Sequence, residues 1–276
     1  MRKYLLLILL IGVVTTLYFV SSSSRGYCLF KPAPEAKKIE RIKEGDQAIA
    51  IKEALGLLKI RKDSQALAIF KGVLVDQPDN LDALWGEAEV LRRSRDYKAS
   101  ESLLNEILKK SPGHTPSLIS LAYIAYKDDK LEEALELINQ VFANDQQDKS
   151  NQALAYMLMG AINSRRSAKS RFFNKIKYGL QIKRHFLKAA TLAPDLPEVH
   201  LALGTFYLLA PAIMGKDLGR AIKELELAVK IAPGFATANA RLAQCYKNKG
   251  MQDKYTFYIS LAKSLDPENE VLRELE

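Results

Sequence analysis

Small and large apolar residues alternate with polar ones at helical spacing, and the same pattern returns along most of the chain. Ala54, Ala88 and Ala122 stand 34 residues apart, and Pro78 and Pro112 repeat that interval. A fixed period of this length indicates an array of small units, each of which buries its apolar face only by packing on its neighbours.

Each unit is expected to be a pair of helices. Alanine, leucine, glutamate and lysine dominate between the turns, and all four have good helix propensity. Small residues at the eighth and twentieth positions of a unit, such as Ala54 and Ala66, mark the point where its two helices cross. Prolines near the unit ends, such as Pro78, stop the second helix. No segment has the pattern of a strand, so the sequence predicts an all-α fold.

These repeated residues resemble the tetratricopeptide repeat. Leu203, Gly204 and Tyr207, followed by Ala221 and Pro233, reproduce most of that family's pattern. The resemblance implies a right-handed α-solenoid of about six helix pairs, here preceded by an N-terminal hydrophobic helix. The units are expected at residues 47–80, 81–114, 115–148, 153–196, 197–235 and 236–269, with a C-terminal tail at residues 270–276.

The first residues of the chain predict a membrane segment. Residues 4–20 are uncharged and mainly apolar, and they follow Arg2 and Lys3. This run is short for a spanning helix and long for a cleaved signal, so residues 1–24 are either a signal anchor, which we favour, or a signal peptide that leaves a soluble periplasmic protein. Residues 25–46 are expected to form a stalk. The short basic head before the apolar run is similar to export signals, which places the repeats in the periplasm or otherwise outside the cytoplasm.

The first helix of each pair is expected to line the inner face of the solenoid. Large apolar side chains at positions five, nine and twelve predict an apolar trough there, and position thirteen adds a basic edge. The predicted groove residues are Ile51, Trp85, Arg92, Ile119, Tyr123, Tyr126, Leu201 and Leu208, and the basic edge is Lys59, Arg93, Lys127 and Arg165. Such a trough suits an amphipathic helix or an acidic segment of a protein partner, and it also suits a fatty ligand with an acid head.

The positive charge of the chain, formally +9, is concentrated in one place. Unit four has ten extra residues between its helices, so we expect a loop from Ser164 to Leu180, and residues 165–184 hold eight basic side chains and no acid. The basic residues assigned to this loop are Arg165, Arg166, Lys169, Arg171, Lys175 and Lys177. The loop is either a solvated surface or a contact for anionic lipid or an acidic partner, whereas nucleic acid is not expected outside the cytoplasm.

Unit five contains a second irregular segment. Pro211 is expected to end one helix, Gly215 to allow a turn with positive φ, and Asp217 to cap the next helix. The segment is similar to a loop in bacterial repeat proteins related to the T component of TRAP transporters, although Lys216 replaces a glycine of that pattern. This resemblance covers residues 160–250 and implies an extracytoplasmic accessory that binds a protein or a hydrophobic ligand.

The sequence offers no pattern of catalytic chemistry. His114, His185 and His200 share no register and lack the neighbours that a metal site needs, and neither a phosphate-binding glycine motif nor a nucleophile elbow occurs. Cys245 is expected to be a buried, inert thiol. We therefore expect neither an enzyme nor a cofactor or metal, but a membrane-tethered scaffold for a protein or peptide. The alternative is a carrier of hydrophobic small molecules that serves a transporter.

Overall fold

The computed structural model of this chain describes residues 45–144, 148–170 and 172–275. The predicted anchor at residues 1–24 and the stalk up to residue 44 lie outside the described residues. Within the described residues every regular element is helical and there is no strand, which confirms the predicted all-α fold. None of the helices described combines the length and the apolar character that crossing a bilayer requires.

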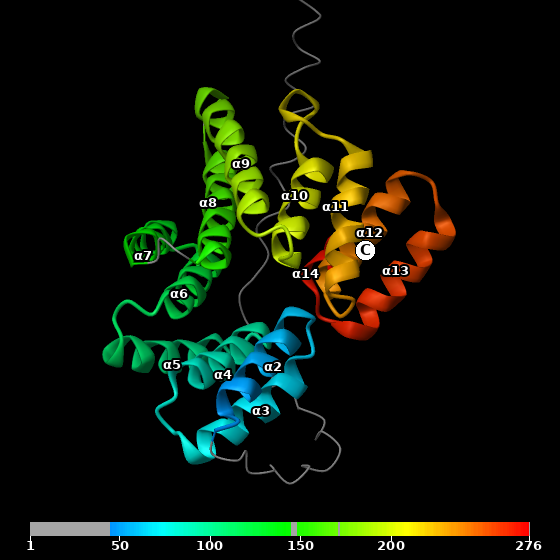
Figure 1. Ribbon diagram of the computed structural model, residues 1–276. Coiled ribbons are helices and arrows are strands. Elements are labelled where there is room, and N and C mark those ends of the chain that lie inside the picture. The colour runs from blue at the N-terminus through cyan, green and yellow to red at the C-terminus, as the bar shows by residue number, and fades with distance from the viewer. Residues whose placement is uncertain (1–44, 145–147, 171, 276) are drawn as a thin grey trace, which may run out of the picture. The chain divides into compact units, whose positions relative to one another are not determined.

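Twelve of the described helices form six successive pairs, which Figure 1 shows as hairpins following one another along the chain. Each first helix packs on its own second helix and on the first helix of the next unit. A short helix, α14 (Glu270–Leu275), follows the last pair. In chain order the pairs are α2 (Gln47–Lys59) with α3 (Asp63–Asp76), α4 (Leu81–Arg93) with α5 (Tyr97–Lys110), α6 (Thr115–Lys127) with α7 (Leu131–Asn144), α8 (Lys149–Lys169) with α9 (Phe172–Leu192), α10 (Pro197–Leu209) with α11 (Leu218–Ile231), and α12 (Ala236–Asn248) with α13 (Gln252–Leu265).

The two helices of a pair approach most closely at the small residues of the repeat. Ala88 is fully buried, and the hydroxyl of Ser100 on the partner helix donates to its carbonyl oxygen at 2.8 Å. Gly160 and Gly204 take the eighth position in units four and five, where a Cβ would lie 2.3 Å from Phe186 and 2.5 Å from Leu225. The small residues are therefore required by packing between helices and not only by helix propensity.

The buried apolar residues form clusters that join neighbouring units. Phe70 and Val73 of α3 pack with Ala83 of the next unit, and Ile138 of α7 packs with Leu158 of α8. A further cluster joins α9, α10 and α12. Contacts between nearest neighbours therefore make the core, as expected for a solenoid.

The turns between the first and second helices use an unusual backbone conformation. Arg61, Arg95 and Asp129 occupy equivalent positions in units one, two and three, with φ values of +66°, +69° and +63°. Gly250 takes the same position in unit six, with φ of +76°. A side chain in this left-handed region costs free energy that glycine avoids.

The expected loop in unit four is wrong. Residues 164–180 are largely helical, because α8 and α9 each run for 21 residues, and Ser170 is the residue that follows α8. The stretch has no proline and only Gly179 as a helix-weakening residue, so the extra residues lengthen both helices instead of forming a loop. The first helix of this unit also begins at Lys149, four residues before the expected boundary at 153.

The irregular segment of unit five has the expected features. Helix α10 ends at Leu209, before Pro211. Gly215 has φ of +105°, and the Asp217 side chain accepts a hydrogen bond from the Arg220 amide at 3.0 Å, which confirms the predicted turn and cap. Between them, the 3₁₀ turn η1 (Ala212–Met214) lays Met214 against Gly179 of α9, whereas Ile213 is 85% exposed.

Candidate partner-binding surface

Arginine side chains stack on tyrosine rings of the neighbouring first helix in units two to four. The Arg92 guanidinium of α4 lies 4.2 Å from the centre of the Tyr123 ring on α6, and Arg165 of α8 lies 4.0 Å from the centre of the Tyr126 ring. The two tyrosine rings are 6.4 Å apart, centre to centre. We call Arg92, Tyr123, Tyr126 and Arg165 the aromatic–arginine ladder. Each of its side chains is partly exposed, so it presents planar, prearranged groups at the surface.

Trp85 anchors one end of the ladder. The indole is partly buried and packs against the apolar clusters of units one and two, and its N–H donates to the Ser120 hydroxyl on α6 at 3.2 Å. Ser120 in turn donates to Glu89 at 3.1 Å. The structure thus brings Trp85, Tyr123 and Tyr126 onto neighbouring first helices, as the repeat register predicts.

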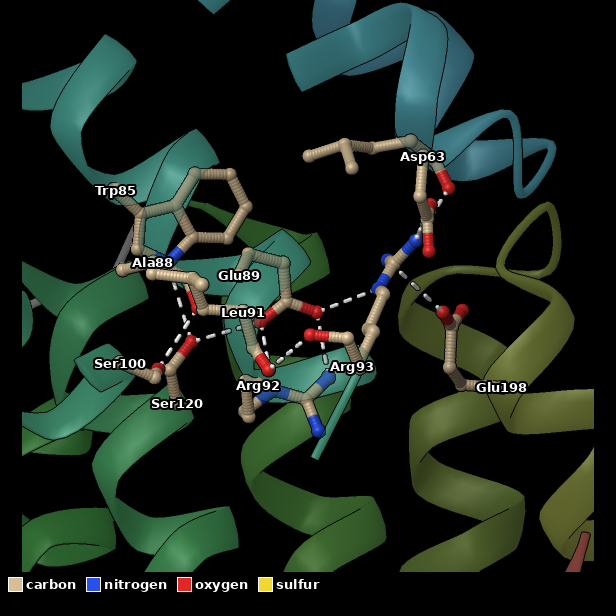
Figure 2. Close-up of polar contacts among 12 residues, drawn as sticks. Asp63, Trp85, Ala88, Glu89, Leu91, Arg92, Arg93, Ser100, Ser120 and Glu198 are labelled. Carbon is tan, nitrogen blue, oxygen red and sulfur yellow. Dashed lines mark hydrogen bonds and ion pairs between the residues drawn. The ribbon is translucent and has the colours of Figure 1, made fainter. Parts of the chain in front are cut away.

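A buried acid to which the sequence analysis assigned no role, Glu89, lies beside Arg92 of the ladder, and Figure 2 shows its polar contacts. Glu89 is 5% exposed and accepts hydrogen bonds from Arg92 at 2.5 and 2.7 Å and from Arg93 at 2.8 Å. Burial opposes ionisation of Glu89, but the two arginines outweigh it and hold the pKa of this carboxyl well below its usual range. Glu89 therefore remains ionised and orients the arginine that stacks on Tyr123. The sequence could have indicated this ion pairing, because Glu89 precedes Arg92 by three residues and Arg93 by four on one helix.

The basic edge is present, but its side chains are already paired. Arg93 donates to the Leu58 carbonyl at 2.8 Å and to Asp63 at 2.8 Å, and Arg165 donates to the Tyr126 carbonyl at 2.6 Å. Both carbonyls lie in the last turn of the preceding first helix, where a positive charge is stabilised. The edge thus joins consecutive units, and its remaining members pair with more distant acids, Lys59 with Asp195 and Lys127 with Glu270.

Three side chains of the predicted apolar trough are buried, so the prediction that they face an open groove is wrong. Ile51 and Ile119 are 8% exposed and Leu208 is 2% exposed, and all three belong to the core clusters. Leu201 is partly buried and packs against the same core as Leu208. Neighbouring first helices contact one another directly, so the flank of each helix is covered by the next helix and not open to a ligand.

The basic residues of unit four lie on helices and divide into two groups. At the end of α8, Arg165, Arg166 and Lys169 pair with Asp129 or Glu132, with 2.8 Å between Arg166 and Glu132. A cleft of about 520 Å³ is lined by Arg166, Lys169 and the two acids together with Leu131, Ser170 and Tyr178. Lys175 and Lys177 are exposed on α9, where neither forms an ion pair with another described residue, and Arg171 lies outside the described residues.

The side chains of His200 and Cys245 have structural contacts. In the described residues no group of histidine, cysteine and acidic side chains has the arrangement of a metal site. His200 is buried with its ring nitrogens 2.7 Å from Glu224 and 2.7 Å from the Pro194 carbonyl oxygen. Cys245 is fully buried, which confirms its expected burial, and burial raises the pKa of its thiol to about 12.

Comparison with known proteins returns one family and a set of helical repeat structures. A family model described as tetratricopeptide repeat matches residues 91–161. No curated protein sequence matches the chain significantly. The comparisons do not show the expected similarity of residues 160–250 to the T component of TRAP transporters.

The similar solved structures have low sequence identity to this chain, and those with TM-scores above 0.5 share its fold. Human IFIT1, in a dimer with PPP-AAAA, has a TM-score of 0.56 and 20% identity, over 83% of this chain and 52% of that one. The Cut9–Hcn1 hetero-tetramer has a TM-score of 0.56 and 15% identity, over 83% of this chain and 42% of that one. Pseudomonas aeruginosa PilF has a TM-score of 0.46 and 18% identity, over 83% of this chain and 96% of that one. The matched segment and the six helix pairs in the same register confirm the predicted resemblance of this chain to tetratricopeptide repeat proteins.

Proposed function

We propose that the repeats are a scaffold that binds a protein or peptide partner through the aromatic–arginine ladder and Trp85. The observation that carries this proposal is the stacking of Arg92 on Tyr123 and of Arg165 on Tyr126. Tyrosine, tryptophan and arginine are the residues most enriched at binding hot spots. Because these side chains are already held by Glu89 and by helix ends, a partner would lose little conformational entropy in binding them.

The alternative, a carrier for a hydrophobic small molecule, has weaker support. A lipid-binding cavity would need the apolar side chains of Ile51, Ile119 and Leu208 on an open wall, but these side chains are buried. The cleft beside α8 is lined mainly by paired charges. Native mass spectrometry of the repeats purified without residues 1–24 separates the two functions, because a carrier would retain lipid and a scaffold would not. The proposal includes no catalysis.

The partner is to be identified by affinity capture with the 276-residue chain in detergent, followed by mass spectrometry. For the captured partner, Trp85→Ala and Tyr126→Ala are each expected to weaken binding by about 2 kcal/mol. Phe257→Ala is the matched control, because this aromatic is 62% exposed on the second helix α13, away from the ladder in the register. Unchanged affinity in both ladder variants would place the contact surface elsewhere.

We also propose that residues 1–24 tether the repeats to a membrane and that the repeats lie outside the cytoplasm. The uncharged run at residues 4–20 and its short basic head support this arrangement. Reporters fused after Glu276 test it, one active only in the cytoplasm and one active only outside. Activity of the cytoplasmic reporter alone would contradict the proposed topology.

A contact of α9 with anionic lipid is a further part of this proposal. Lys175 and Lys177 are exposed on α9, and the same region carries Leu180, 65% exposed, and Ile213, 85% exposed. Exposed lysines with projecting apolar groups suit an anionic bilayer surface. Co-sedimentation with phosphatidylserine vesicles is measured on the chain without residues 1–24, because that segment would itself insert in any bilayer, and is expected to fall in Lys175→Glu/Lys177→Glu. Equal binding of the shortened chain to neutral and to phosphatidylserine vesicles would contradict this contact.

A further inference from the structure

Basic side chains of units one to three pair with acidic side chains at the end of unit four, in units five and six, and in the helix that follows them. The nitrogen–oxygen distances are 2.5 Å for Arg61 and Glu198, 2.7 Å for Arg95 and Asp266, and 2.5 Å for Lys127 and Glu270. Lys59 also pairs with Asp195. Partners in these pairs are separated by 136 to 171 positions of sequence. We call these four pairs the ionic seam.

Two arginines of the seam occupy strained backbone positions. Arg61 and Arg95 have φ values of +66° and +69°, where Gly250 of unit six shows that glycine fits the same turn. Strain of this kind persists only where the surrounding structure supports it. We therefore examined what the side chains of these two arginines contact. The Arg61 guanidinium lies 3.9 Å from the centre of the Phe235 ring, and that of Arg95 also donates to the Glu268 carbonyl at 3.2 Å.

One pair of the seam is largely buried, whereas the other three are more open to solvent. The side chains of Arg61 and Glu198 are 11% and 20% exposed, and burial lowers the pKa of Arg61 to about 10. Gly234 lies against this site, where an added Cβ would come within 3.2 Å of the Arg61 Cβ. In the other three pairs at least one side chain is more than a third exposed. Exposed pairs contribute little free energy and are screened by salt, so these three can exchange partners readily.

The basic half of the seam adjoins the proposed binding surface. Lys127 follows Tyr126 directly on α6, and Arg95 lies in the turn that follows Arg92 and α4. A partner bound on the aromatic–arginine ladder would therefore reach these two positive charges. In the structure both charges are paired with acids of the chain itself, and we call this paired arrangement closed.

We infer that Lys59, Arg95 and Lys127 form a docking surface for an acidic segment of a protein partner, which the chain's own acids cover until that segment displaces them. This inference rests on the proposed scaffold function and adds the chemistry and the regulation of its partner. The pairing of these bases with Asp195, Asp266 and Glu270 supplies the argument for an acidic occupant. The partner must compete with these acids. Its apparent affinity is therefore the intrinsic affinity multiplied by the fraction of molecules in which the pairs are open.

The test neutralises the covering acids and leaves the bases in place. The seam variant is Asp195→Asn/Asp266→Asn/Glu270→Gln, and the control variant is Glu101→Gln/Glu136→Gln/Asp253→Asn, which removes the same charge from exposed acids outside the seam. The probe is a fluorescein-labelled polyglutamate peptide at low salt, measured by anisotropy. We expect the seam variant to bind about tenfold more tightly than the control variant and to show a larger radius of gyration in small-angle scattering. Adding Arg95→Gln/Lys127→Gln to the seam variant should abolish the gain.

Equal affinity of the seam and control variants would overturn the inference, whether or not the radius of gyration changes. If circular dichroism shows that the seam variant has lost helix, Gly234→Leu serves instead, because it opens the seam by steric contact with Arg61 and changes no charge. It too must bind the peptide more tightly than the unmodified chain. The scaffold function itself is judged separately by the captured partner, so loss of binding in Trp85→Ala together with no effect in the seam variant would retain the scaffold and remove the acidic docking surface.

Discussion

The Arg95 guanidinium donates to the Asp266 carboxylate at 2.7 Å, although 171 positions of sequence separate the two residues. Most contacts in a helical repeat array lie within a unit or between neighbours. This ion pair instead joins unit two to the turn before α14. The repeat pattern of the sequence does not predict ion pairs between such distant units.

The close helix crossing at Gly160 is expected to tolerate no side chain. A Cβ there would lie 2.3 Å from the Phe186 ring, so Gly160→Ala should lower the free energy of unfolding by about 1–3 kcal/mol through overpacking. Gly56→Ala on α2 is the matched control, because nothing lies within 4 Å of its added Cβ and alanine favours the helix by about 0.5–1 kcal/mol. Urea unfolding measures both. Equal effects of the two substitutions would contradict the crossing.

Removal of the buried acid at the ladder should be strongly destabilising. Glu89→Ala leaves Arg92 and Arg93 without their shared carboxylate in a largely buried place, a loss of about 3–5 kcal/mol in the free energy of unfolding. As a control, Glu133→Ala breaks an exposed pair with Lys130 and should cost less than about 1 kcal/mol. Chemical denaturation monitored by circular dichroism compares them. A loss below about 1 kcal/mol for Glu89→Ala would show that this network does not support the fold.

The stability of the protein is expected to fall with acidification. Hydrogen bonds from Lys59 hold the pKa of Asp195 below its usual range, and the arginines beside Glu89 do so for that carboxyl despite its burial. Since these pKa values are lower in the folded chain than in the unfolded one, the unfolded chain binds more protons below about pH 5. The stabilisation is therefore complete above the ordinary carboxyl pKa and is lost as the pH falls through the folded value.

Urea midpoints between pH 7 and pH 3 measure this loss. The decline should be shallower in Glu89→Gln than in the unmodified chain, because one of the contributing carboxyls is absent. A midpoint independent of pH over this range would contradict the assignment of ionised, paired carboxyls in the folded protein.

The thiol of Cys245 should resist modification until the chain unfolds. It is fully buried on α12, and burial raises its pKa to about 12, so little thiolate exists at neutral pH. In a Cys28→Ser background, reaction with Ellman's reagent is expected to be negligible in the native protein and complete in guanidinium chloride. Rapid reaction of the native protein would place Cys245 at the surface.

The sequence by itself determined the repeated helix pair. Ala54, Ala88 and Ala122 mark the period, and Pro211, Gly215 and Asp217 predict the boundaries of the irregular turn, because these features depend on side-chain size and local backbone preference. The arrangement of Trp85, Tyr123 and Tyr126 on neighbouring first helices also follows from the register. Local chemistry is sufficient where each contact lies within one period of the repeat.

Tertiary structure alone decided which of these side chains are available. Ile51 and Ile119 have the same position in the repeat as Trp85, yet they are buried because the next first helix covers them. The extra residues of unit four lengthen both of its helices, since no proline lies between Ser164 and Gly179 and the two helices pack along each other on either side of the turn at Ser170. The pairing of Arg95 with Asp266 and of Lys127 with Glu270 depends on how small rotations add up over successive units, a sum that no single period of the sequence encodes.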